Sequence, residues 1–171
     1  RMNDRLGWIR ELVRAEETME DVGVVEIGSK ADTERLLVEE TLSYLQTLKN
    51  DFVDAASAFN ELKSSPLGRL KIYGIAKTHA DFMLFRNGFK MIFSLRAAGQ
   101  ISIRFNFIGP NYIPSQIPSS QQSNTPIMEE HILEAKVGPF EDIQWTFQGH
   151  PVKAANVVKY HLSLFVKESS K

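Results

Sequence analysis

A long run of helical periodicity in residues 31–63 constrains the fold more than any other feature of the sequence. Its apolar residues recur at steps of three or four, which places them on one stripe of an α-helix: Leu45, Leu48, Phe52, Ala55, Phe59 and Leu62. No proline interrupts the run before Pro66. At about 1.5 Å per residue the helix would be roughly 50 Å long, more than a domain this small usually needs for its own core. Another part of the chain, or a second copy of it, must therefore cover the stripe.

Residues 69–108 have the period of two that is typical of β-strands, and they predict a four-stranded antiparallel meander. The Asn87-Gly88 pair predicts a two-residue hairpin, because a type I′ turn needs positive φ at both positions. The next hairpin keeps its apolar residues on one face only if its loop is residues 97–99, with Gly99 in the left-handed region beside a bulge. The long helix should pack on this face and bury six aromatic rings together: Phe52, Phe59, Phe89, Phe93, Phe105 and Phe107.

The N-terminal residues 1–28 predict an amphipathic helix from Asn3 to about Glu20, followed by a short strand. We expect this helix to pack on the long one. Residues 109–126 contain four prolines and predict a low-complexity connection. Three apolar residues of this loop are candidate anchors to the fold or to a partner: Tyr112, Ile113 and Ile117.

The C-terminal residues 127–171 predict a helix, a strand and a helix. The first helix would run from Thr125-Pro126 to Gly138, and the strand would occupy residues 140–147. The last segment, from Pro151 to about Glu168, also alternates as a strand would, but its helical stripe favours a helix. The chain thus predicts a single α+β domain over residues 1–171. Its long amphipathic helix would pack on a four- to five-stranded antiparallel meander, with flanking N- and C-terminal helices.

The composition is that of a globular protein, with 43% hydrophobic and 24% charged residues. The chain has no cysteine, which excludes disulfides and thiolate metal sites and fits a reducing compartment. No apolar run approaches the roughly 18 residues of a membrane span. We therefore expect a cytoplasmic protein with no membrane span and no disulfides.

The charges are strongly segregated along the chain. Residues 1–63 carry 8 basic and 14 acidic side chains, whereas residues 64–108 carry 7 basic side chains and one acidic side chain. Opposite charges on the helical and sheet parts would let one copy of the chain approach another. This segregation, together with the excess apolar stripe, leads us to expect a homodimer.

No catalytic motif is recognisable. The four histidines fit no metal or triad pattern, and His79 and Asp81 could hold a metal only with a third ligand that the sequence does not show. We expect His150 to be a surface residue in a tight turn, and His131 and His161 to be partly exposed helix residues. The sequence therefore predicts no catalytic residue, no metal and no cofactor, and it leaves open an enzyme without a recognisable motif.

The outer face of the predicted meander interleaves basic and aromatic side chains. Six of its residues are candidate binding residues: Lys71, Tyr73, Phe85, Lys90, Arg96 and Arg104. Our leading hypothesis is a non-catalytic protein-interaction or regulatory module that self-associates. The first alternative is a nucleic-acid-binding domain, because such a face can stack bases and neutralise phosphates. The second alternative is a small-molecule-binding domain or enzyme.

Overall fold

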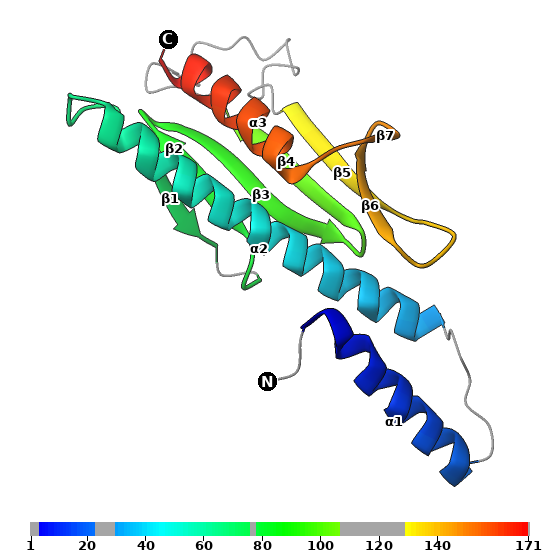
Figure 1. Ribbon diagram of the computed structural model, residues 1–171. Helices are drawn as coiled ribbons and strands as arrows, with labels where there is room; N and C mark the ends of the chain where they lie inside the picture. The colour runs from blue at the N-terminus through cyan, green and yellow to red at the C-terminus, as the bar shows by residue number, and fades with distance from the viewer. Residues whose placement is uncertain (1–3, 23–29, 76–77, 107–128, 171) are drawn as a thin grey trace, which may run out of the picture. The chain divides into compact units, whose positions relative to one another are not determined.

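The structure, a computed structural model, describes residues 4–22, 30–75, 78–106 and 129–170 (Figure 1). The chain divides into two compact units, Arg1–Glu34 and Arg35–Lys171. The first unit contains a 3₁₀ turn, η1 (Asp4–Leu6), and the helix α1 (Gly7–Val22), which confirms the predicted N-terminal helix. The predicted strand after it lies outside the described residues. The packing of α1 on the long helix and the single-domain organisation stay predictions.

The long helix α2 spans Lys30–Leu62, close to the predicted 31–63. Beyond it the chain forms an antiparallel sheet in which every strand pairs with the next one in sequence. The seven strands are β1 (Lys71–Gly74), β2 (Phe82–Arg86), β3 (Phe89–Ala97), β4 (Gln100–Asn106), β5 (Glu129–Val137), β6 (Ile143–Phe147) and β7 (His150–Pro151). The helix α3 (Ala154–Ser169) follows, as predicted. The α+β class and the meander are confirmed, and the sheet has more strands than expected. Among the described residues, no helix is both long and apolar enough to cross a membrane.

Both turns of the predicted meander are confirmed. Asn87 and Gly88 have φ angles of 52° and 84°, as a type I′ turn requires. In the next hairpin Leu95 pairs with Ile101, and a register shift between Leu95 and Ala97 marks the expected bulge. Gly99 has a φ of 75°, and a Cβ atom there would lie 3.0 Å from Leu37 of α2. The positive φ therefore favours glycine at this position, and a larger side chain would also press on the side chain of Leu37.

The helix predicted from Thr125-Pro126 to Gly138 is wrong, because residues 129–137 form β5. Their glutamates, alanine and leucine favour a helix locally, but the backbone of β4 needs a hydrogen-bonding partner on its second edge. Strand β5 supplies it, with Ile101 opposite Leu133 and Ile103 opposite His131. The period of two then directs alternate side chains of β5 to the core face. Tertiary pairing has overridden the local helix preference.

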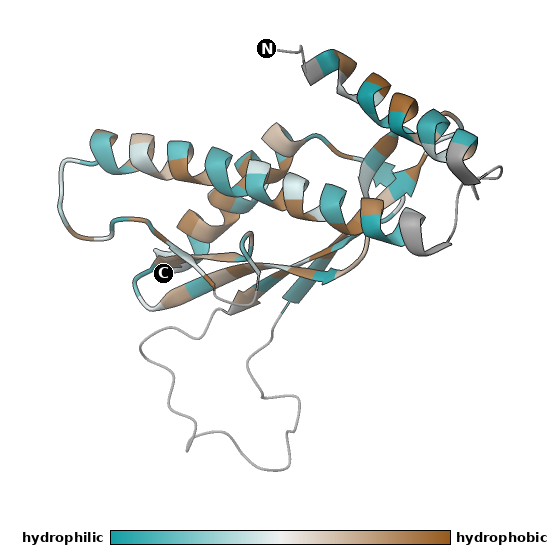
Figure 2. Cartoon of the chain, turned by 90° about the horizontal axis from the view of Figure 1, so that it is seen from below, coloured by the Kyte–Doolittle hydropathy of each residue, from teal (hydrophilic) through white to brown (hydrophobic). Residues whose placement is uncertain are grey.

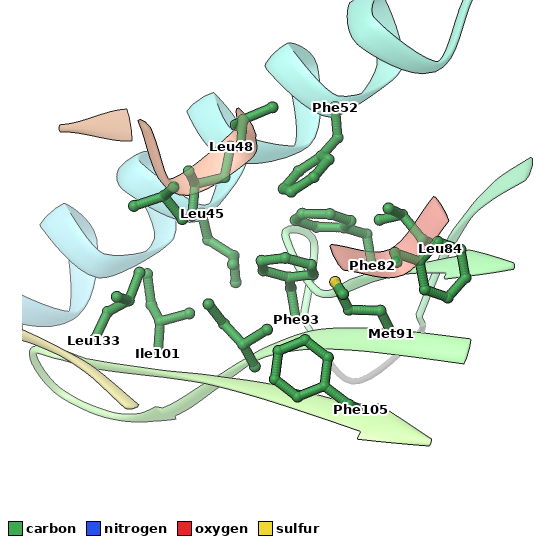
Figure 3. Close-up of a cluster of buried hydrophobic side chains, with 14 of the residues drawn as sticks. Leu45, Leu48, Phe52, Phe82, Leu84, Met91, Phe93, Ile101, Phe105 and Leu133 are labelled. Carbon is green, nitrogen blue, oxygen red and sulfur yellow. The ribbon is translucent and has the colours of Figure 1, made fainter. Parts of the chain in front are cut away.

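The core lies between the sheet and the two helices α2 and α3, which lie side by side on the same face of the sheet (Figures 1 and 2). Phe52 of α2 points down onto the rings of Phe82 and Phe93, at centroid distances of 5.8 and 4.9 Å (Figure 3). The rings of Phe82 and Phe93 stack on each other at 4.7 Å. This cluster is the predicted contact between the long helix and the phenylalanine-rich face.

The predicted cluster of six phenylalanines is confirmed for most of its members. Phe52, Phe93 and Phe105 are fully buried and Phe89 is nearly so, whereas Phe59 is only partly buried. Phe107 lies outside the described residues. Leu62, the last residue of the predicted stripe, is 88% exposed. The sheet therefore covers the stripe up to the last turn of α2.

An arginine on the core face of the sheet joins three parts of the fold. Arg86, at the end of β2, is only 6% exposed. Its guanidinium donates to four acceptors near the C-terminal ends of α2 and α3: the carbonyl oxygens of Gly68 and Val166 and the hydroxyls of Ser169 and Ser170. It also lies 5.5 Å from the centre of the Phe59 ring. A cation suits the C-terminal end of α3, because the last carbonyl groups of a helix carry a partial negative charge.

We expect Arg86→Lys to lower the free energy of unfolding by about 2 kcal/mol or more, because a single ammonium cannot reproduce the fork of donors that meets these acceptors. Denaturant unfolding of the purified protein measures the effect. Arg96→Lys is the matched control, since Arg96 is exposed and its guanidinium donates to the side chain of Gln100. Equal stability of the two variants would contradict the role given to Arg86.

Candidate ligand-binding pocket

A tight turn brings α3 back over the last strands of the sheet. Gln148 and Gly149 have φ angles of 51° and 83°, and Phe147 pairs with His150 across them. The amide of Val152 then donates to the carbonyl of Trp145, and α3 begins two residues later. The tight turn and the exposed position of His150 are confirmed. This short connection places the first half of α3 against β5 and β6.

A cavity of about 470 Å³ lies between α3 and strands β5–β7. It is lined by His131, Leu133, Phe147, Gln148, Pro151, Val152, Asn156, Val157, Tyr160 and His161. Apolar and aromatic side chains supply much of this lining, with a few polar groups among them. Small-molecule sites typically have roughly this size and this mixture of groups.

Two histidines meet at the wall of this pocket. His131 comes from β5, where its side chain points to the same face as that of Leu133. His161 comes from α3, one helical turn after Val157 and one before the buried Phe165. Nδ1 of His131 lies 3.1 Å from Nε2 of His161, and Nδ1 of His161 lies 2.6 Å from the carbonyl oxygen of Val157. Helix and strand are therefore joined by a side-chain hydrogen bond.

Aromatic rings surround the histidine pair. Phe105 of β4 stacks on His161 at a centroid distance of 5.8 Å and meets His131 edge-on at 4.9 Å. Phe147 lies 4.9 Å from His131, and Tyr160 lies 5.1 Å from His161. These contacts fix the orientation of both imidazoles and keep water away from much of their surface.

The apolar surroundings keep both histidines neutral at pH 7. Burial lowers the pKa of His161 to about 4, against the smaller opposing effect of its hydrogen bond to Val157, and His131 lowers it further. Burial also lowers the pKa of His131, while the charge of Glu129 raises it. The pair is thus uncharged and can bind a ligand through hydrogen bonds.

The expectation that His131 and His161 are partly exposed helix residues is confirmed only in part, since His131 is partly exposed and His161 lies on helix α3. In the other respects it is wrong. His131 lies on a strand, and His161 is only 5% exposed. Two sequence signals could have placed them: the alternation of His131 with Leu133, and the spacing of four residues from Val157 to His161 to Phe165. Their meeting could not be predicted without the pairing of β4 with β5.

The six candidate residues of the outer face do not form one cluster. Lys71, Phe85 and Lys90 stand opposite one another on three neighbouring strands, β1 to β3. The neighbouring row holds Tyr73, whose ring lies 6.3 Å from that of Phe85, and Arg104. Arg96 lies at the other end of β3 from Lys90. The three loop candidates, Tyr112, Ile113 and Ile117, lie outside the described residues.

Strand β5 adds carboxylates to this outer face, which the sequence reading had not foreseen. Glu130 stands opposite Arg104 and accepts a hydrogen bond of 2.5 Å from the hydroxyl of Ser102. Glu134 follows four residues later on the same face. The outer face of β5 therefore carries two carboxylates beside the basic strands β1–β4, with Lys136 as its own basic residue.

His79 and Asp81, which could hold a metal only with a third ligand, do not gain one among the described residues. Asp81 is buried, and its carboxylate accepts from the hydroxyl of Thr78 and the amide of Leu95, whereas His79 is exposed. No group of three or more potential metal ligands occurs in the part of the chain that the structure describes.

Buried His161 should make the folded state sensitive to acid. Between its folded pKa of about 4 and its ordinary value of 6.5, the unfolded chain binds a proton that the folded chain does not. The free energy of unfolding should therefore fall as the pH is lowered through this range, by about 3 kcal/mol from this residue. Denaturant unfolding at several pH values measures the slope. His161→Phe should flatten this pH dependence, whereas the exposed control His150→Phe should not. Equal slopes in the two variants would contradict the assignment of the acid sensitivity to His161.

Comparison of the chain with family models, curated proteins and solved structures finds no match. The chemistry of the pocket is the basis on which we assign a function.

Proposed function

We propose that this chain is a small-molecule-binding domain whose ligand occupies the pocket between α3 and strands β5–β7. The observation that carries the proposal is a pair of neutral histidines at the wall of a largely apolar cavity of about 470 Å³. The pocket is partly open to solvent, since Gln148, Asn156 and Tyr160 of its lining are exposed, and small molecules commonly bind in concave apolar sites of this kind. A space of this size beside oriented polar groups favours a bound molecule.

The polar groups of the pocket suit binding and orientation. Besides the histidines, the lining includes the side chains of Gln148, Asn156 and Tyr160. Each of these can form hydrogen bonds to a neutral ligand, and the aromatic rings can stack on an apolar one. We propose reversible binding and assign no reaction.

The proposal predicts that the neutral fluorescent probe N-phenyl-1-naphthylamine binds with a stoichiometry of one. Asn156→Phe should reduce its affinity about tenfold or more, because the larger side chain occupies the pocket. Ala155→Phe is the matched control, since Ala155 is the exposed neighbour on α3 and does not line the cavity. Fluorescence titration measures both affinities. An absence of binding, or equal loss in the two variants, would contradict the proposal.

A second proposal concerns the outer face of the sheet, which supports the protein-interaction role expected from the sequence. Tyr73 is 45% exposed there, and Met83, Phe85 and Ile92 are only partly buried. Partly exposed apolar groups surrounded by charge are common at protein interfaces. The nucleic-acid alternative has less support, because Glu130 and Glu134 border the basic strands and would repel phosphates.

If the outer face mediates self-association, the protein in about 0.15 M salt should have a molar mass of twice 19.4 kDa, since an apolar interface is not screened by salt. Light scattering at micromolar concentration measures it. Phe85→Glu should restore the mass of one chain, whereas Phe140→Glu, at a residue that is 91% exposed, should not. A wild-type mass of 19.4 kDa would leave the dimer without support.

A further inference from the structure

The hydrogen-bond chain through the two pocket histidines has a direction that is fixed at one end. Nδ1 of His161 lies 2.6 Å from the carbonyl oxygen of Val157. A carbonyl oxygen can only accept a hydrogen bond, so the proton of neutral His161 is on Nδ1. Its other nitrogen, Nε2, therefore carries a lone pair and can only accept.

The same reasoning places the proton of His131. Nδ1 of His131 lies 3.1 Å from Nε2 of His161. Because that Nε2 accepts, Nδ1 of His131 has to donate, and Nε2 of neutral His131 is left as an acceptor. Among the described residues, no hydrogen-bond donor is found on this remaining nitrogen.

The surroundings of the pair preserve this direction at neutral pH. Burial lowers the pKa of both imidazoles, so neither carries the second proton that would turn Nε2 of His131 into a donor. Within the described residues, the titratable groups that face the pair are Glu129 on β5 and Tyr160 on α3. The rings of Phe105 and Phe147, each 4.9 Å from His131, keep its imidazole from turning away.

We propose that the pocket selects an apolar molecule that carries a hydroxyl or N–H group, and that this group donates a hydrogen bond to Nε2 of His131. The inference rests on the proposed function, since it concerns the same pocket. It adds the chemical class of the ligand and the atom that recognises it.

His131 can discriminate between ligands that donate a hydrogen bond and ligands that only accept one, because its Nε2 is fixed as an acceptor. The amides of Gln148 and Asn156 and the hydroxyl of Tyr160 can each donate or accept, so they favour neither kind of ligand. An ether or ketone of the same shape would place its lone pairs against that of Nε2 and leave the nitrogen unsatisfied. Such a mismatch in an apolar pocket typically costs about tenfold or more in affinity.

The test compares 2-naphthol with 2-methoxynaphthalene, which share a naphthalene ring and an oxygen atom; in the ether a methyl group replaces the hydroxyl proton. Calorimetric titration of the full chain at neutral pH gives both affinities. We expect 2-naphthol to bind about tenfold or more tightly. His131→Phe, which keeps an aromatic ring between Phe105 and Phe147, should abolish this preference and leave the affinity for 2-methoxynaphthalene within about twofold. The control His150→Phe should keep the preference.

A second measurement does not depend on any variant. The ¹⁵N chemical shifts of the imidazole nitrogens report which nitrogen carries the proton, and we expect Nδ1 in both His131 and His161. A proton on Nε2 of His131 at neutral pH would overturn the inference.

The outcomes of the titration separate the inference from the function on which it rests. Equal binding of the two probes, or tighter binding of 2-methoxynaphthalene, would overturn the selection of a donor but leave the pocket as a binding site. Binding of neither probe would contradict both. Tighter binding of 2-naphthol that persists in His131→Phe would assign the selection to another residue and would overturn the role of Nε2.

Discussion

The guanidinium of Arg86 is the interaction on which the arrangement of this fold depends. It lies on the core face of the sheet, where an apolar side chain would be expected, and it donates to groups from the end of α3 and from the connection after α2. The amide of Asn87, the next residue, donates to the carbonyl of Ser169. A buried cation without these acceptors would destabilise the fold. Its hydrogen bonds therefore hold the end of α3 and the connection after α2 together over the hairpin between β2 and β3. This end of α3 is thereby fixed, and with it the face on which His161 reaches His131.

Much of the first half of the fold could be predicted from local patterns. The stripe of α2 and the Asn87-Gly88 turn depend on residues that are close in sequence, and the alternation of β2 and β3 then determines which side chains are buried. The first error occurs at β5, where local preference favours a helix and only the free edge of β4 explains a strand. That edge is separated from β5 by residues 107–128, so no local pattern links the two.

The candidate pocket could not be predicted for the same reason. His131 and His161 are 30 residues apart in sequence and meet only because β5 joins the sheet and α3 folds back over it. The sequence drew attention to the outer face, where basic and aromatic residues alternate visibly. The signal for the inner face of β5 is weaker, because His131 alternates with Leu133 but follows two glutamates that favour a helix. The periodicity of each element can place its own histidine on a face, but it does not indicate that the two histidines meet.

The pocket also lies at the margin of the core, and this position matters for how the protein could change. Several lining residues, including Gln148, Asn156 and Tyr160, are exposed, whereas the phenylalanine cluster of α2, β2 and β3 is fully buried. Substitutions at exposed positions usually change stability by less than about 0.5 kcal/mol. These exposed lining residues are thus largely decoupled from the scaffold, unlike the buried His161. Random variation could alter which molecules bind while the sheet and its two helices persist, which makes this architecture a suitable starting point for directed evolution of new binding specificities.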